Sequence, residues 1–359
     1  MTMSWSLTAG EPVRGVIGVP VPADWTGLDF LQQYVRGQVE GGPIGRLTGV
    51  RASEFGSGRA TFVLPVTEWL QNSAAFIEPG VMALLADGPL SCAILSGLGP
   101  GQGVVTSELS VTYIQPVTRG TSKLVGRGAT LHSSRTAAVS TCEVTDAEGR
   151  LLAHATTRCV MVDVPTAPSG SGFPAPVEYD VPDPYLRPVE GEIRPPEFWN
   201  ALSGREMVQA FVDGEVAPGP ISVLFGMRPT DVGDGEVSAE MAATGWHCGM
   251  GGTVFGGLLA MFAQSCMESA ILTTLPAGTL HATLDLTVHF IRPVLPGDGT
   301  VKVVATVDHR GRLVRVASAR ILDAQGRTVA LARESAMVVP DGIRRMLRGE
   351  FFQAATFYQ

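Results

Sequence analysis

The sequence predicts an α+β protein made of two tandem copies of one unit, in each of which a mostly antiparallel sheet wraps one long apolar helix. Three observations predict this fold class. The sequence repeats itself at a fixed offset, each copy holds one long apolar stretch without a β-branched run, and apolar and polar residues alternate in the segments that follow that stretch. A helix and a sheet that each carry an apolar face bury those faces against one another.

The repeat has a constant offset of 177 residues. Without a gap, residues 36–44 (RGQVEGGPI) align with 213–221 (DGEVAPGPI), and residues 106–120 (TSELSVTYIQPVTRG) align with 283–297 (TLDLTVHFIRPVLPG). One offset kept over so long a stretch indicates an internal duplication of a unit with the size of an ordinary domain. The two halves are therefore expected to share one fold.

The duplication divides the chain into five parts. They are an N-terminal extension (1–27), a first domain (28–163), a Pro-rich linker (164–198), a second domain (199–341) and a C-terminal tail (342–359). The many prolines of the linker disfavour both helix and sheet hydrogen bonding, so we expect an extended, semi-rigid connection. The tail is long enough for one amphipathic helix.

Each unit is predicted to begin with a short helix, a Gly/Pro turn and two short strands. In chain order these segments are 28–36, 44–53 and 58–65 in the first unit and 205–213, 221–230 and 235–242 in the second.

The longest helical segment of each unit comes next, at 80–95 and 257–272. Three or four strands are predicted after it. Residues 109–113 alternate between apolar and polar, which is typical of a strand with one face on an apolar core. Hairpin turns are expected between the last two strands of each unit, at 146–149 and 323–326.

Composition excludes several classes of protein. With 45% hydrophobic and 17% charged residues, the chain is too apolar to be disordered. A net charge of −8 disfavours a nucleic-acid partner, because such binding depends on an excess of Lys and Arg. Five cysteines without a CxxC pair indicate reduced core thiols rather than disulfides or a metal site, so we expect a cytosolic protein without a metal.

Other motifs are missing as well. The sequence has no GxSxG, no strand–GxGxxG and no GK[ST], which disfavours an elbow-type serine hydrolase and a nucleotide-binding loop. The first residues lack the pattern of a signal peptide. The most apolar helical segment, 254–275, is interrupted by Gln264 and Glu268, so we expect no membrane-spanning helix.

Residues 251–279 read GGTVFGGLLAMFAQSCMESAILTTLPAGT. This string resembles the hotdog fold and, within it, acyl-CoA thioesterases of the phenylacetic-acid-degradation type. In that family an Asn-containing loop leads through Gly-Thr-Val-His-Gly-Gly into the central helix, and an Asp or Glu seven residues after the second Gly carries the chemistry. The resemblance covers roughly 28–163 and 205–340. It implies a double hotdog that hydrolyses an acyl-CoA thioester and needs no cofactor beyond the coenzyme A of its substrate.

Each unit departs from the family pattern in its own way. The first has Asn72, Gly80, Asp87 and Ser91 at motif positions, but Glu78 and Pro79 replace His-Gly. The second keeps His247, Gly256 and Gly257, but has Phe255, Gly249 and Gln264 at the His, Asn and acid positions. Each half has thus lost what the other retains.

The resemblance implies that the acid of one unit faces the helix start of the other. The site that we expect to be competent combines Asp87 and Ser91 with the backbone around Gly256 and Gly257. Asp87 lies in an apolar segment, where partial desolvation would make it a better base. Direct attack by its carboxylate is the other route. The free amides at the start of the partner helix could bind the oxyanion, and Ser91, one helical turn after Asp87, could orient the water or the carboxylate.

The second site lacks an acid at the motif position and is expected to be degenerate. It would combine Gln264 with Asn72 and Gly80. Glu268, one turn after Gln264, could partly restore it.

For several of these residues a purely structural role is the alternative to a role in catalysis or substrate binding. Asp87-Gly88-Pro89 is also a turn signal, so Asp87 could end its helix in solvent. Asn72 and His247 could make loop or cap hydrogen bonds instead of contacting substrate. Arg135 and Arg312 could grip the phosphates of coenzyme A, or they could be solvated surface residues.

The function that we predict from the sequence is thioester hydrolysis, with an acyl group that enters an apolar channel between the units. The alternative is a non-catalytic double hotdog that binds acyl-CoA. The sequence leaves room for a homodimer of double-hotdog chains.

Overall fold

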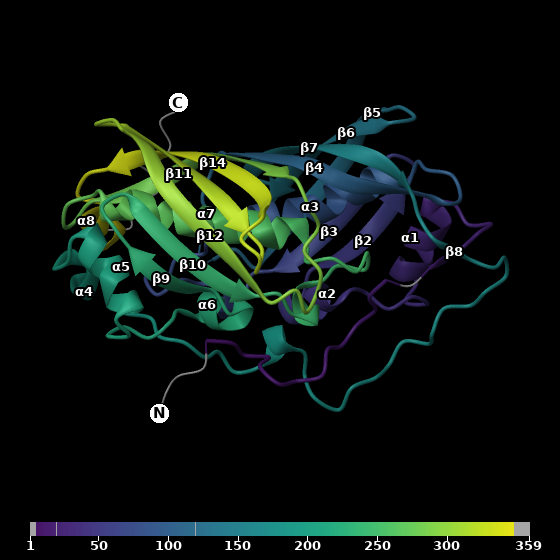
Figure 1. The fold of residues 1–359 in the computed structure, drawn as a ribbon, viewed down its shortest axis with the longest axis horizontal. Helices are drawn as coiled ribbons and strands as arrows, with labels where there is room; N and C mark the ends of the chain where they lie inside the picture. Colours follow the sequence, from purple (N-terminus) through teal and green to yellow (C-terminus); the bar gives the residue numbers. More distant parts are fainter. Residues whose placement is uncertain (1–4, 19, 119, 348–359) are drawn as a thin grey trace.

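The two halves of the molecule share one continuous sheet. The computed structural model describes residues 5–18, 20–118 and 120–347. Within these residues a 12-stranded sheet has the order β2-β3-β5-β6-β7-β4-β11-β14-β13-β12-β10-β9, and it wraps the helices α3 (Gly80–Leu95) and α7 (Gly256–Thr273) (Figure 1). The larger sheet is antiparallel throughout.

The elements of the two halves correspond one to one. The first half contains α1 (Gly27–Val35), α2 (Pro43–Thr48), β2 (Arg51–Gly56), β3 (Arg59–Pro65), η1 (Glu68–Leu70), α3, β4 (Gln102–Tyr113), β5 (Lys123–Ser133), β6 (Ala137–Thr145) and β7 (Leu151–Asp163). The second contains α5 (Gly204–Val212), α6 (Pro220–Phe225), β9 (Arg228–Val232), β10 (Glu236–Ala242), η3 (Gly245–His247), α7, β11 (Leu280–Phe290), β12 (Thr300–Arg310), β13 (Val314–Leu322) and β14 (Thr328–Val339). The predicted duplication is therefore visible in the order of the elements.

The halves meet where β4 pairs with β11. Ser110 lies opposite Thr287, which is its own equivalent at the offset of 177, and the two hydroxyl oxygens are 3.2 Å apart. A pseudo-twofold axis therefore passes through this pair. Because the axis joins the two sheets edge to edge, the central helices lie against each other beneath one shared surface.

Glycines allow the central helices to touch. A Cβ atom added to Gly257 would lie 2.9 Å from the Cα of Leu84, and one added to Gly80 would lie 2.7 Å from the Cγ of Met261. Both helices are buried on nearly all sides, as expected from their uniformly apolar sequences. The start of each helix therefore packs on the middle of the other.

Two predicted strands begin as helices. Residues 44–53 and 221–230 were expected to be extended, but their first parts form α2 and α6. Each helix has Pro at its first position and ends at a glycine in the left-handed region, with φ of 80° at Gly49 and 72° at Gly226. A short helix that buries most of its residues cannot be told from a buried strand by periodicity alone, which explains the error.

Pro89 does not end α3. The helix runs to Leu95, and the backbone at Pro89 lies so close to β5 that a Cβ atom on Gly128 would be 2.1 Å from the Pro89 carbonyl oxygen. Proline removes one helical hydrogen bond. The burial of the segment outweighs that loss, so the turn signal at 87–89 is overridden.

The linker runs back along the first half and is tied to the N-terminal segment. β1 (Val21–Pro22) pairs in parallel with β8 (Thr166–Ala167), and residues 168–183 contain neither helix nor strand, in agreement with an extended connection. The linker also contains η2 (Pro184–Leu186), and α4 (Pro196–Asn200) crosses the predicted boundary with the second domain. After β14 the chain forms the short helix α8 (Gly342–Leu347), and the rest of the predicted tail, 348–359, lies outside the described residues.

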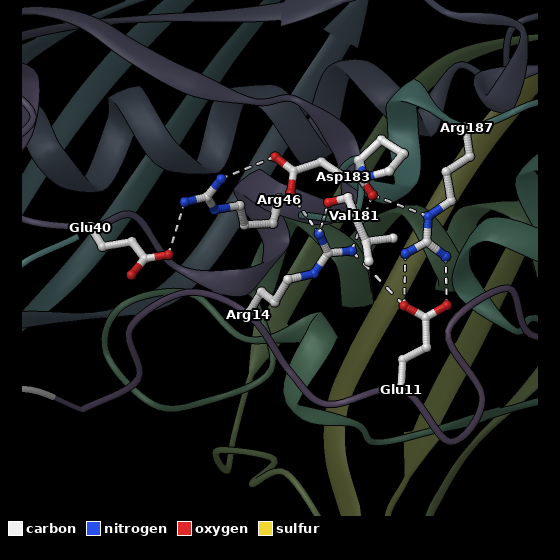
Figure 2. A network of polar contacts seen from close by, with 8 residues as sticks. Glu11, Arg14, Glu40, Arg46, Val181, Asp183 and Arg187 are labelled. Carbon is white, nitrogen blue, oxygen red and sulfur yellow. Dashed lines mark hydrogen bonds and ion pairs between the residues drawn. The ribbon is translucent and has the colours of Figure 1, made fainter. Parts of the chain in front are cut away.

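A network of ion pairs fixes this arrangement (Figure 2). The guanidinium of Arg187 binds both carboxylate oxygens of Glu11 at 2.5 and 2.7 Å, and Arg46 of α2 bridges Glu40 and Asp183 at 2.9 and 3.2 Å. Because these contacts join the N-terminal segment, α2 and the linker, they hold the linker against the first half.

Among the described residues, no helix has both the length and the apolar character needed to cross a membrane.

Candidate active site

Asp87 of α3 meets the start of α7. Its Oδ2 accepts a hydrogen bond from the Gly257 N–H at 2.9 Å, and its Oδ1 accepts one from the Thr106 hydroxyl at 3.4 Å. The side chain is buried, with the residue 4% exposed, so the solvated, helix-ending role is wrong. Burial raises the pKa of Asp87 to about 6, while the two hydrogen bonds act in the opposite direction.

This contact leaves little room for a substrate. A Cβ atom added to Gly256 would lie 3.0 Å from Asp87 Oδ2, and the Gly257 amide that was expected to bind an oxyanion already donates to the carboxylate. Ser91 donates to the carbonyl oxygens of Asp87 and Gly88 in its own helix, at 2.8 and 3.2 Å. Its hydroxyl proton is therefore directed at the backbone rather than at the carboxylate of Asp87.

The equivalent position in the second half is Gln264, which is fully buried. Tyr113 of β4 donates to Gln264 Oε1 at 2.5 Å, and Gln264 Nε2 donates to Glu268 Oε1 at 3.3 Å. Thr283 of β11 donates to the same carboxylate oxygen at 2.5 Å. A chain of hydrogen bonds thus orients the Gln264 amide toward the carboxylate one turn further along α7.

Glu268 also meets a carboxyl group from the other half. Its carboxyl interacts with that of Glu78, which in turn interacts with the side chain of Asn72. Burial raises the pKa of both glutamates, and the charge of Glu78 raises that of Glu268 further. Two buried carboxyls in contact are expected to share one proton, so near neutral pH one is ionised and the other is protonated.

Asn72 has a second role at this site. Its side-chain oxygen accepts from the amides of Ala74 and Phe76 at 3.0 and 3.1 Å. The predicted loop-capping role is therefore present together with the contact to Glu78. The cap shapes the loop that leads into α3 and so positions Glu78.

A third carboxyl lies behind this pair. Glu334 of β14 is fully buried, and within the described part of the chain neither of its carboxyl oxygens has a hydrogen-bond partner. Burial and the nearby charges of Glu268, Asp285 and Glu78 raise the pKa of Glu334 well above its ordinary value. Across residues 5–18, 20–118 and 120–347, no group of three or more His, Cys, Asp or Glu side chains is arranged to hold a metal ion.

A cavity of 340 Å³ opens beside the Glu78–Glu268 pair, a volume within the usual range for small-molecule sites. Its wall combines the loop 72–79 and Tyr113 of the first half with α5, α7 and β11 of the second. Apolar side chains line much of it, among them Met207, Phe211 and Phe262. Asn72, Glu78 and Glu268 belong to this wall and Asp87 does not. The cavity is therefore at the site that the sequence predicts to be degenerate.

Three predicted substrate-binding residues lie elsewhere. His247 is 3% exposed in the core, where burial lowers its pKa to about 4. Arg135 and Arg312 are exposed on the β5–β6 and β12–β13 connections. None of the three belongs to the cavity wall, so the geometry does not bring them together with the carboxyl pair.

Sequence reasoning assigned no role to Tyr113, Thr283 or Glu334, and it treated Glu78 only as a departure from the motif. A comparison of the two copies of the repeat could have pointed to Tyr113 and Glu334. Tyr113 stands where the second half has Phe290, and Glu334 stands where the first half has Thr157. Of the polar residues that differ between the copies, Tyr113, Glu78 and Glu268 line the cavity.

Comparisons with known proteins agree with the architecture. Residues 79–153 and 251–330 match the model of the Thioesterase superfamily, while no curated protein matches the chain. Among solved structures, the tesB protein of Mycobacterium avium subsp. paratuberculosis has a TM-score of 0.52 at 14% identity and covers 83% of this chain and 98% of its own. A conserved protein of unknown function with a hot dog fold from Alicyclobacillus acidocaldarius has a TM-score of 0.51 at 15% identity, with coverages of 82% and 97%.

These findings define the class. The solved structures and the sheet order show a tandem double hotdog, as the sequence predicts. The Thioesterase superfamily model matches one segment in each half, and this supports the hydrolysis of a small-molecule thioester as the reaction class.

Proposed function

We propose that this protein hydrolyses an acyl-CoA thioester in the cavity between its halves, with Glu268 as the general base. One observation supports this location above all others: the cavity wall carries a pair of buried carboxyls, Glu78 and Glu268, contributed by the two halves. A site of this kind offers an acid and a base next to an apolar space for the acyl group.

Shared protonation gives the pair two roles. In the resting pair the charge is on Glu78 and the proton on Glu268. The proton first passes to Glu78, and the ionised Glu268 then takes a proton from water while the water oxygen forms a bond with the thioester carbonyl carbon. When the C–S bond breaks, Glu78 gives its proton to the departing thiolate, which leaves as the free thiol. This leaves the proton on Glu268 and the charge on Glu78, as in the resting pair. Direct attack by Glu268, with an anhydride intermediate, is the alternative route.

The carbonyl oxygen needs a donor as negative charge develops on it. The Gly80 amide at the start of α3 is the repeat equivalent of Gly257, and amides in the first turn of a helix have no intrahelical partner. A donor of this type lowers the barrier by about 3 kcal/mol. Gln264, held by Tyr113, orients the Glu268 carboxylate toward the water.

The Asp87–Gly257 contact is the second candidate for the reacting site, because an acid and a helix start do meet there. We compare Glu268→Gln and Asp87→Asn, two near-isosteric variants that remove one charge each. Thiol release from a panel of acyl-CoAs is expected to fall by roughly 100-fold or more in kcat for Glu268→Gln. Asp87→Asn is expected to keep most of the wild-type rate.

The reverse pattern would move the chemistry to Asp87. Saturable binding of acyl-CoA to the wild type without turnover would instead support the non-catalytic double hotdog. The cytosolic compartment and the homodimer stay predictions, which cell fractionation and sedimentation would test.

A further inference from the structure

The cavity wall has an uneven distribution of charge. Glu78 and Glu268 supply its acids, and among the described residues that line it Arg228 is the single Arg or Lys. His281 also belongs to the wall, but burial lowers its pKa to about 4, so it carries no charge near neutral pH. Arg228 is therefore the permanent positive charge of the site.

The guanidinium of Arg228 makes one weak ion pair within the described part of the protein. Its ion-pair partner is Glu240 at 3.9 Å, with 53% of the arginine side chain and 35% of the glutamate side chain exposed. Exposed pairs of this kind contribute little to stability. Within the described residues the guanidinium makes no hydrogen bond, so its five N–H donors are available to a ligand.

Arg228 and Glu268 lie in different parts of the second half. Arg228 begins β9, the strand at the outer end of the sheet order, whereas Glu268 is on the central helix α7 (Figure 1). A molecule that fills the cavity can therefore place its thioester near Glu268 and a second group near the edge strand.

We propose that Arg228 binds an anionic group of the thioester substrate while the thioester itself lies at the Glu78–Glu268 pair. A guanidinium fork recognises carboxylate and phosphate oxygens by paired hydrogen bonds. The anion is either a phosphate of coenzyme A or a carboxylate at the far end of the acyl group. In a chain of net charge −8, one accessible cation at the cavity has a large effect on where an anionic ligand binds. This proposal rests on the proposed function.

The repeat supplies a matched control. Arg51 is the equivalent of Arg228 at the offset of 177, begins the edge strand β2 and is exposed. It lies beside a separate cavity of 320 Å³, whose wall includes neither Glu78 nor Glu268. Replacement of Arg51 thus removes an equivalent charge without touching the proposed site.

The experiment measures KM and kcat for wild type, Arg228→Ala, Arg228→Lys and Arg51→Ala. Three substrates separate the sources of the anion: valeryl-CoA, glutaryl-CoA, and the valeryl thioester of N-acetylcysteamine, which has no phosphate. Arg228→Ala is expected to raise KM about tenfold for the substrate that carries the recognised anion, with little change in kcat. Arg228→Lys should recover part of the loss, and Arg51→Ala should behave like wild type.

A rise for both CoA thioesters but not for the N-acetylcysteamine thioester identifies the phosphate. A rise for glutaryl-CoA alone identifies the acyl carboxylate. Equal KM values for wild type and Arg228→Ala on all three substrates would overturn the assignment, as would the same change in Arg51→Ala. If wild type shows no turnover, the proposed function fails, and calorimetric binding of the same compounds to wild type and Arg228→Ala decides the role of Arg228 independently.

Discussion

The Asp87 site and the Glu268 site are related by the pseudo-twofold axis, yet the 340 Å³ cavity opens beside Glu268 and does not include Asp87 in its wall. In the first, the acid contacts the partner helix directly, and the carboxylate accepts a hydrogen bond from the Gly257 amide. In the second, Gln264 takes the place of Asp87 and the acid is one turn later, at the position of Ser91 in the first half. A shift of one helical turn places this acid in the cavity wall, together with Glu78 of the other half.

The largest expected difference between the halves is the loss of unfolding free energy when the glycine at each helix contact is replaced by alanine. Gly257→Ala would place its methyl group against the backbone of Leu84, which cannot rotate away, so we expect a loss of about 3 kcal/mol in unfolding free energy. In Gly80→Ala the methyl group meets one backbone atom, the Cα of Met261 at 3.0 Å, and otherwise the Cβ and Cγ of that side chain, which can shift in part, so the loss should be smaller, about 2 kcal/mol. Denaturant unfolding of both variants measures this difference, and equal losses would mean that the crossing is symmetric in energy.

Asp87 is expected to make stability depend on pH. Its pKa of about 6 in the folded protein lies above the ordinary value of 3.8, so folding is favoured more below pH 3.8 and this contribution is lost as pH rises through 6. Asp87→Asn lacks the titrating group and keeps an acceptor for Gly257. Relative to wild type, it should gain about 2 kcal/mol between about pH 4.5 and pH 7.5. Parallel stability curves for the two proteins would show that Asp87 titrates as it does in water.

Glu78→Gln tests the proton sharing at the second site. We expect kcat to fall about tenfold because the acid for the leaving thiolate is lost. Removal of the neighbouring negative charge should also lower the pKa of Glu268, so the acid limb of the pH–rate profile should move to lower pH. An unchanged limb would show that the two carboxyls act independently, and a structural defect alone would not move it.

Ser91→Ala should have the smallest effect. Its hydroxyl donates to carbonyls of its own helix, and alanine is the better helix former, so stability should change by less than about 0.5 kcal/mol. The rate should stay within about twofold of wild type. A tenfold slower enzyme would restore the role that the sequence predicts for Ser91.

Much of the fold follows from the repeat and its periodicity, because long apolar segments and alternating strands are local signals. The helix predicted at 80–95 is observed with those bounds, whereas residues 44–48 were assigned to a strand because periodicity alone cannot tell a short buried helix from a buried strand. The contact of Asp87 with Gly257 also follows from the resemblance, since both residues hold motif positions.

The cavity could not be predicted in the same way. Its location depends on how Glu78 of one half meets Glu268 of the other, a contact between residues far apart in the sequence. The burial of Glu334 was equally hidden, because a glutamate on a strand is usually solvated.

The pairing of β4 with β11 has a consequence for any attempt to express one half of the chain without the other. Expression of residues 28–163 alone would leave β4 with a row of unsatisfied amides and carbonyls, which a second copy could cover by placing Ser110 opposite Ser110. Such a symmetric assembly would place each Asp87 against Gly80 of the other copy, the equivalent of Gly257, and would contain no Glu268. The fusion of two unequal copies in one polypeptide is thus what allows a single molecule to hold both arrangements.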